Sequence, residues 1–385
     1  MTESDGRISR RELLERGALG GLGIAGLAAL AGVSSTEVED AFAAWAAKSG
    51  ISTKLIAAAK KDGHLNVITL PTDWADYGEI MNTYQSRWKI GITDDNPLGT
   101  SAEEIKAIQD LKGQSRAPDV VDVSLTFADV GKKGGLFSPY KVATWSSIPK
   151  SMKDPGGAWV GDYWGAQSFL SVGSVVKNPP KDWSDLTKPE YKGQVAIDND
   201  PRQAGDAFGA VMAAALANGG SLDNIAPGID FFAKLKQLGN WNPTIAHEVQ
   251  IERGETPIAI RWDYLNLATR DTMASKGLKA TVTIPTHGVY GGYYCQAISK
   301  FAPHPNAAKL WMEFIYSDEG QLFFLKGYTH PARFADLAKR KKVPKSLASK
   351  LPKASLYKPV KFASLAQITK ANVVLNQQWG PKMGA

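Results

Sequence analysis

The sequence predicts an α/β protein with two lobes and one cleft between them. Segments of strand composition alternate along the chain with segments of helical periodicity, which is typical of a sheet covered by helices. Two long apolar stretches, 163–176 and 290–298, are predicted to be extended and to connect one lobe to the other. The 385 residues suffice for two such lobes, and the 43% hydrophobic content excludes a disordered chain.

Residues 1–47 are predicted to be an export signal whose end is uncertain. Arg10 and Arg11 precede the uncharged stretch 17–33, which is rich in Gly, Ala and Leu. Paired arginines before a weakly hydrophobic stretch resemble a twin-arginine signal. The stretch is shorter than the roughly 20 residues of a membrane-spanning helix. We therefore expect an exported, periplasmic or extracytoplasmic protein, tethered to the membrane only if the signal is not cleaved.

Lobe 1 is predicted to comprise residues 48–165 and 292–345. Thr100-Ser101 before Glu103-Glu104 is a capping-box signal for the start of a helix. The rhythm of strands and helices predicts a parallel sheet covered on both faces. The expected strands are 65–70 and 119–124, and the expected helices are 51–61, 76–88, 101–111, 127–134, 305–317 and 319–326.

Lobe 2 is predicted to comprise residues 166–291, and residues 346–385 are predicted to form a C-terminal helical tail. Strand ends in α/β sheets open onto the cleft, so the loops that follow them are the candidate ligand-binding segments. The expected strands are 195–198, 257–262 and 280–285, and the expected helices are 203–217, 229–238 and 264–276.

Several function classes lack their signatures in this chain. Cys295 is the only cysteine, which excludes an intramolecular disulfide and a thiolate metal cluster. The five histidines show no metal-binding spacing, and neither a nucleophile elbow nor a P-loop is present. The net charge is +7, but the lysines are scattered, so nucleic acid is not an expected partner. We expect a monomeric, non-enzymatic protein with no cofactor and no metal; an exported enzyme is the alternative class.

Seven short segments occur in an informative order along the chain. They read AKKDGHLNVIT (59–69), SAEEI (101–105), PDVV (118–121), PEYKG (189–193), GETPIAI (254–260), APHPNAA (302–308) and SDEGQ (317–321). Together they resemble the extracellular solute-binding proteins of ABC importers, within which the ferric, polyamine and phosphonate group is most similar. The resemblance covers roughly residues 51–345. It implies a type II periplasmic-binding fold with a hinge and an interlobe cleft, and delivery of a small solute to a permease driven by an ATPase.

Candidate ligand-binding residues follow the strands of both lobes and combine aromatic rings with carboxylates and hydroxyls. An aromatic face attracts an ammonium group by ~0.5–2 kcal/mol, and a desolvated carboxylate fixes the charged end by a stronger hydrogen bond. The pattern favours a small organic cation. The candidates are Thr72, Asp73, Trp74, Tyr77, Ser124, Thr126, Asp198, Asp200, Gln203, Trp262, Asp263, Tyr264, Tyr290, Tyr294 and Tyr328.

The resemblance to polyamine binders extends to individual positions. Gln203 stands where that group has an acid, and Tyr294 stands where it has a second amine-clamping carboxylate. Asp263 is the candidate replacement for the lost charge, and one carboxylate fewer suggests a shorter or singly charged amine. The matching positions are Trp74, Asp76, Tyr77, Asp200 and Tyr328.

Two other ligands and a structural interpretation stay open. A phosphonate-like anion would need hydroxyls and helix N-termini, which Thr72, Ser124 and Thr126 could help to supply. Ferric binders have a tyrosine pair where this chain reads Trp262-Asp263-Tyr264, with one tyrosine. As structural alternatives, Trp74 and Trp262 could belong to the core, and Asp198 and Asp200 could cap the helix that follows them.

Overall fold

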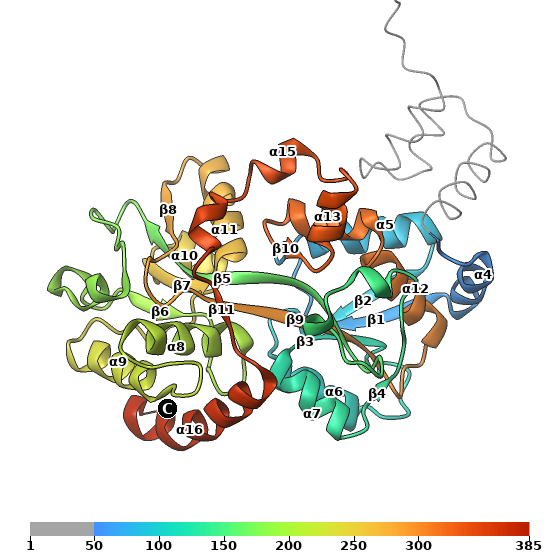
Figure 1. The fold of residues 1–385 in the computed structure, drawn as a ribbon, viewed down its shortest axis with the longest axis horizontal. Coiled ribbons are helices and arrows are strands. Elements are labelled where there is room, and N and C mark those ends of the chain that lie inside the picture. Colours follow the sequence, from blue (N-terminus) through green and yellow to red (C-terminus); the bar gives the residue numbers. More distant parts are fainter. Residues whose placement is uncertain (1–49, 385) are drawn as a thin grey trace, which may run out of the picture.

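Two long strands run through the middle of the molecule. The computed structural model describes residues 50–384, so the predicted export signal lies outside the described residues (Figure 1). β5 (Val160–Val172) and β9 (Tyr290–Ser299) pair with each other in antiparallel orientation. Figure 1 shows that they connect two groups of elements, here called the first half and the second half.

The first half contains the N-terminal elements together with helices from after β9. α12 packs on α4, and the backbone N–H of Asn306 donates to Asp62 Oδ2 at 2.7 Å. The elements are α4 (Thr53–Asp62), β1 (His64–Ile68), α5 (Tyr77–Trp88), β2 (Gly91–Asp95), α6 (Ser101–Asp110), β3 (Val120–Ser124), α7 (Leu125–Lys133), β4 (Phe137–Ser138), α12 (Pro305–Ile315), α13 (Asp318–Lys326), β10 (His330–Pro331) and α14 (Phe334–Lys339).

The second half is built around the far end of β5. β7 and β8 both pair antiparallel with β5, and β6 pairs parallel with β7. Its elements are β6 (Val195–Ile197), α8 (Gly205–Ala217), α9 (Ala226–Gln237), α10 (Glu248–Glu252), β7 (Ile258–Trp262), α11 (Asp263–Ser275) and β8 (Ala280–Thr283). In the described chain as a whole, short 3-10 helices cover Trp145–Ser147, Lys150–Met152, Trp183–Thr187, Pro189–Tyr191 and Ala354–Tyr357.

The prediction of a parallel sheet is wrong in part. β1 and β2 form a parallel two-stranded sheet of their own, whereas the larger sheet is mixed: β6 and β7 are parallel, but β3 runs antiparallel to β9 with Val123 opposite Cys295. The returning strand β9 lies in the sheet beside β3, which pattern alone could not indicate. β2 was also missed, because only one of its five residues, Ile92, is a large apolar residue.

The predicted capping box at the start of α6 is confirmed. The Thr100 hydroxyl accepts from the backbone of Glu103, and Glu103 Oε2 accepts from the backbone N–H of Thr100 at 2.7 Å. Such a cap satisfies two N–H groups that the helix leaves free. It fixes the position of Ser101 and Glu104 at the inner end of α6.

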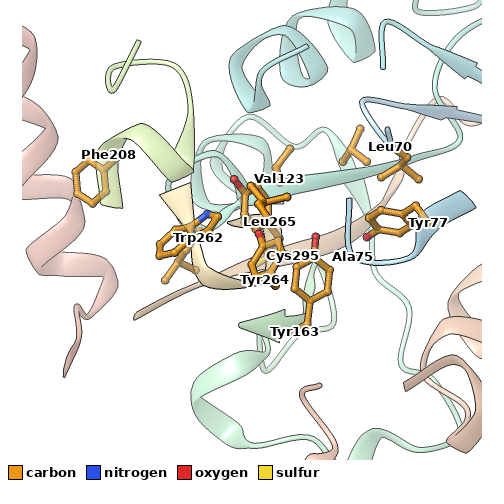
Figure 2. Packing of buried hydrophobic residues seen from close by; sticks show 14 of the residues in the cluster. Leu70, Ala75, Tyr77, Val123, Tyr163, Phe208, Trp262, Tyr264, Leu265 and Cys295 are labelled. Atoms are coloured by element: carbon orange, nitrogen blue, oxygen red, sulfur yellow. The ribbon is translucent and has the colours of Figure 1, made fainter. Parts of the chain in front are cut away.

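Buried aromatic side chains of β5, β7 and α11 pack together where the two halves meet. Figure 2 shows Tyr163, Tyr264 and Trp262 in one cluster of buried side chains. The rings of Tyr163 and Tyr264 meet edge to face with centroids 5.5 Å apart. Aromatic contacts of this geometry add ~0.5–1.5 kcal/mol beyond the area they bury.

The C-terminal residues lie against both halves. After α15 (Lys345–Ala348), β11 (Lys361–Phe362) pairs in parallel with β9, and α16 (Leu365–Met383) packs on α9 through Trp379 and Phe232, with ring centroids 5.6 Å apart. The Asn372 side chain also donates to Thr126 Oγ1 of the first half at 3.1 Å. Among residues 50–384, none of the helices combines the length and the apolar character needed to cross a membrane.

Candidate functional site

A cavity lies between the two halves. It contains about 720 Å³ of empty space, part of it open to solvent. The loop after β1, the loop after β2, the start of α6 and β3 form the wall from the first half. The loop after β6 and the starts of α8 and α10 form the wall from the second half, with Arg261 of β7. Tyr294 of β9 lies between the two walls.

Acidic residues outnumber basic ones in the cavity wall. Asp198 is the acid nearest to a base: Arg261 Nε lies 3.7 Å from its Oδ2, and His247 Nδ1 lies 3.3 Å from its Oδ1. An ionised carboxylate only accepts hydrogen bonds, so these groups suit an occupant that donates them. The six acidic residues of the wall are Asp73, Glu104, Asp122, Asp198, Asp206 and Glu248.

Four of these carboxylates are buried: Glu104, Asp122, Asp198 and Asp206 are only 1%, 4%, 6% and 2% exposed. Within residues 50–384, Asp198 Oδ1 has no hydrogen bond but lies 3.3 Å from His247 Nδ1, and each of the other three leaves one oxygen without a partner. Glu104 Oε2 accepts from the backbone of Asp122 at 2.9 Å, and Asp206 Oδ1 accepts from the backbone of Trp262 at 2.9 Å. Glu104 Oε1, Asp122 Oδ1 and Asp206 Oδ2 find no hydrogen-bond partner among the described residues. A buried oxygen without a partner is unfavourable, so a ligand that donates to it gains affinity.

Burial changes the protonation of these groups. Burial raises the pKa of Asp122 to about 6, although hydrogen bonds from Tyr77 and Tyr163 oppose the change. Burial also raises the pKa of Glu104 and of Asp206 well above the usual range, and a neighbouring aspartate adds to each change. A desolvated carboxylate favours its neutral form until a cation compensates its charge. These groups are therefore poised to lose protons when a cation binds.

A second row of polar groups holds Asp122 in place. Tyr77 Oη donates to Asp122 Oδ2 at 2.7 Å, and Tyr163 Oη lies 3.2 Å from the same oxygen. Trp74 Nε1 donates to Tyr163 Oη at 2.7 Å. Burial first and the charge of Asp122 second raise the pKa of Asp162, which lies 3.2 Å from Tyr77 Oη. The network links the aromatic wall of the cavity to its buried carboxylate.

The solvent end of the cavity holds another pair of acids. Asp73 is exposed on the loop after β1, and Glu248 is half-buried at the start of α10. Burial first, and the hydrogen bond and charge of Asp73 next, raise the pKa of Glu248 to about 7. The two acids belong to opposite halves, so their interaction depends on the distance between the halves.

The structure brings four of the sequence-predicted residues to this cavity, namely Asp73, Trp74, Asp198 and Tyr294. The rings of Trp74 and Tyr294 meet edge to face at 5.6 Å. A second hollow of about 420 Å³, with no carboxylate in its wall, contains another group of predicted residues and also borders Tyr294. That group is Ser124, Thr126, Trp262 and Tyr290.

The remaining predicted residues lie outside both hollows. Although burial opposes the change, hydrogen bonds from Arg202 lower the pKa of Asp200, whose Oδ1 accepts from Arg202 Nε at 2.9 Å. Asp263 is buried and accepts from Tyr357 Oη at 2.5 Å, and Tyr328 bonds Asp271. The residues in this group are Thr72, Tyr77, Asp200, Gln203, Asp263, Tyr264 and Tyr328.

Sequence reasoning missed most of the acids of the cavity. One signal was available: Asp122 occupies the middle of β3, where all five residues are buried, and an acid in such a strand is unusual. Asp206 likewise interrupts an otherwise apolar helix start. Glu104 was counted only as part of the capping signal. Within the described part of the chain, no group of three or more His, Cys, Asp or Glu side chains has a geometry that could hold a metal ion.

Comparisons with known proteins identify relatives by family and by fold. A family model described as bacterial extracellular solute-binding protein matches residues 115–367. No curated protein sequence matches the chain.

The chain aligns with nearly the full length of several solved structures. The periplasmic binding protein AfuA from Actinobacillus pleuropneumoniae, with fructose-6-phosphate bound, aligns with a TM-score of 0.62 at 19% identity, over 82% of this chain and 98% of that one. Iron-bound HitA from Pseudomonas aeruginosa aligns with a TM-score of 0.61 at 18% identity, over 82% of this chain and 99% of that one. An ABC transporter substrate-binding protein from Bradyrhizobium japonicum USDA 110 aligns with a TM-score of 0.65 at 16% identity, over 83% of this chain and 99% of that one. These similarities establish the mixed α/β fold of two-lobed periplasmic binding proteins, and the ligands named differ.

Proposed function

The chain belongs to the bacterial extracellular solute-binding proteins, and on that premise we propose that it captures a small organic amine for an ABC importer. In this proposal the captured solute passes to a membrane permease driven by an ATPase. The protein acts as a monomer outside the inner membrane after twin-arginine export, and it catalyses no reaction.

The unpartnered carboxylate oxygens of Glu104, Asp122 and Asp206 are the observation that supports an amine most directly. An ammonium group has three donors and no acceptor, so it complements oxygens that only accept. Charge-assisted hydrogen bonds of this kind are about twice as strong as neutral ones. Trp74 and Tyr294 line the same cavity and supply aromatic surface for the alkyl part of an amine.

We further propose that the ligand is held by closure of two lobes. Residues 48–165 with 292–345 would form one lobe and residues 166–291 the other, with β5 and β9 as the connecting hinge strands. The cavity supports this division, because Asp122 and Asp206 approach it from opposite halves. A ligand that bridges the two carboxylates would favour the closed state by its differential affinity.

A phosphonate-like anion is the second candidate. The helices α6, α8 and α10 all begin at the cavity wall, and helix N-termini bind anions. Arg261 adds one positive charge to that wall. The acids of the wall that are ionised repel such a ligand, and Arg261 alone compensates them with a permanent positive charge, so we rank the amine first.

A thermal unfolding panel distinguishes the candidates. Putrescine, spermidine and agmatine are compared with methylphosphonate, glycerol phosphate and ferric citrate. A ligand at a hundredfold excess over its Kd stabilises the native state by ~2.7 kcal/mol. We expect stabilisation by at least one of the three amines and by neither phosphate-type anion. Stabilisation by the anions alone would overturn the amine proposal, and co-purified ligand identified by mass spectrometry gives an independent answer.

A further inference from the structure

The segment after α14 has an unusual charge. Residues 339–361, here called the basic strap, contain nine Lys or Arg residues and no Asp or Glu. All nine side chains are exposed. In Figure 1 the strap passes through α15 at the top of the molecule and then descends toward β11 near the middle of the view. The solute cavity makes no use of this segment.

Most of this positive charge is not neutralised within the molecule. Arg340 pairs with Asp318 and Asp336, and the Lys350 ammonium group lies 5.7 Å from the ring centroid of Tyr328. No carboxylate of residues 50–384 forms an ion pair with the other seven basic side chains. The strap therefore presents seven exposed basic side chains to solvent without an ion pair from the described residues.

Apolar side chains are interspersed with the lysines. Leu356 is 38% exposed and Phe362, directly after the strap, is 42% exposed. Leu347 and Leu351 are half-buried in the same segment. Lysines combined with exposed leucine and phenylalanine are typical of segments that bind the interface of a lipid bilayer.

The strap is anchored to the body of the protein at its C-terminal end. Tyr357 Oη donates to the buried Asp263, and Lys361 pairs with Tyr290 in the β11–β9 ladder. The His330 ring lies between Trp164 and Tyr357, with ring centroids 3.9 Å and 4.5 Å away. The C-terminal end of the strap is therefore fixed to the body of the protein by a hydrogen bond, by strand pairing and by ring contacts.

We propose that the basic strap docks the protein on an anionic lipid bilayer. A solute-binding protein outside the membrane must meet a permease embedded in that membrane, and an attraction to the lipid surface would confine the search to two dimensions. Each basic residue near an anionic surface strengthens binding by about fivefold, and the attraction decays within a Debye length of ~10 Å at 0.1 M salt. The inference rests on the family and on the surface, and it does not depend on which solute the cavity binds.

Co-sedimentation with lipid vesicles tests the proposal. The full chain is mixed with vesicles of phosphatidylcholine alone or with 30% phosphatidylglycerol, so that the preference for anionic lipid is the quantity measured. We expect a clear preference at low salt that disappears at high salt. The quadruple substitution K342Q/K345Q/K353Q/K358Q should weaken the preference at least about tenfold.

A matched control removes the same charge elsewhere. K54Q/K61Q/K192Q/K234Q neutralises four exposed lysines on α4, after Tyr191 and on α9. We expect it to change the preference less than about threefold. Equal losses in the two variants, or no preference in the wild type, would overturn the proposal. Thermal unfolding of both variants checks that each is folded, and L356A alone should also reduce anionic-vesicle binding if apolar insertion contributes.

A protein partner is the other outcome. If lipid-only vesicles bind the strap variant and the wild type alike, while vesicles that contain the permease bind only the wild type, the strap recognises protein and the lipid proposal is wrong.

Discussion

Asp73 and Glu248 approach each other across the cavity from opposite halves of the molecule, close enough for their carboxyl groups to interact by a hydrogen bond. Burial first and Asp73 next raise the pKa of Glu248 from 4.5 to about 7. Glu252 increases this effect and Arg261 opposes it. Protonation of Glu248 therefore favours contact between the halves, and its ionisation opposes contact.

The raised pKa of Glu248 predicts a pH-dependent stability. Because the folded protein holds this proton more tightly than the unfolded chain does, the stabilisation is complete below about pH 4.5 and is lost as the pH rises through about 7. In E248Q, the free energy of unfolding of the ligand-free protein should decline less between pH 5 and pH 8 than in the wild type. Urea unfolding at several pH values measures this slope. E255Q changes an exposed glutamate nearby, and a slope for E248Q equal to that of E255Q would contradict the prediction.

Amine binding should strengthen as the pH rises. An ammonium group replaces protons on carboxyl groups whose pKa is raised, such as Asp122 at about 6 and Glu248 at about 7. We expect the affinity for the amine identified in the panel to increase about tenfold from pH 5.5 to pH 7.5, with net release of protons. Calorimetry in two buffers with different ionisation enthalpies measures the protons released. Proton uptake on binding would be inconsistent with this assignment.

Asp206 should matter more for amine binding than Asp200. Asp206 lines the cavity and its Oδ2 has no hydrogen-bond partner among residues 50–384, whereas the carboxylate of Asp200 is held by Arg202. We expect D206N to weaken binding at least about tenfold and D200N to weaken it less than about threefold. A charge-assisted hydrogen bond from the amine to Asp206 is stronger than one to Asp200, because Arg202 already neutralises Asp200. Isothermal titration gives both values, and thermal unfolding confirms that each variant is folded. The reverse ranking would place the ligand on the loop before α8.

Trp74 is expected to contact the amine through its ring. The ring lies at the cavity wall, and its indole N–H donates to Tyr163, which in turn lies beside Asp122. W74A should cost ~1–3 kcal/mol of binding free energy through lost apolar area and cation–π contact. W74F keeps an aromatic face and should retain most of the affinity. If W74F loses as much as W74A, the indole hydrogen bond to Tyr163 is the important contact.

The bond between Tyr357 and Asp263 anchors the basic strap. Y357F removes the donor at 2.5 Å from Asp263 Oδ2 and leaves a buried acceptor unsatisfied. We expect the free energy of unfolding to fall by ~1–3 kcal/mol. In the D263N background the same substitution should cost less than half as much, because the charge is gone. Equal costs in the two backgrounds would show that the charge of Asp263 does not strengthen the bond from the Tyr357 hydroxyl.

Much of the fold could be predicted from local pattern. The alternation of strands and helices, the capping box at Thr100, and the extended segments that became β5 and β9 all follow from residue periodicity and side-chain chemistry. The same reasoning identified aromatic and acidic loops after the strands, of which Asp73, Trp74 and Asp198 line the cavity. The charge of the basic strap is likewise a property of the sequence.

Only the tertiary structure decided which carboxylates meet and which of them lack partners. Asp122 and Asp206 are far apart in the chain, and their approach depends on how β3 and α8 pack around β9. A sequence pattern shows which face of an element a side chain occupies, but burial and pairing of a charge depend on distant segments. For the same reason Asp200 and Asp263, equal candidates by sequence, acquired partners in Arg202 and Tyr357 that no local pattern could reveal.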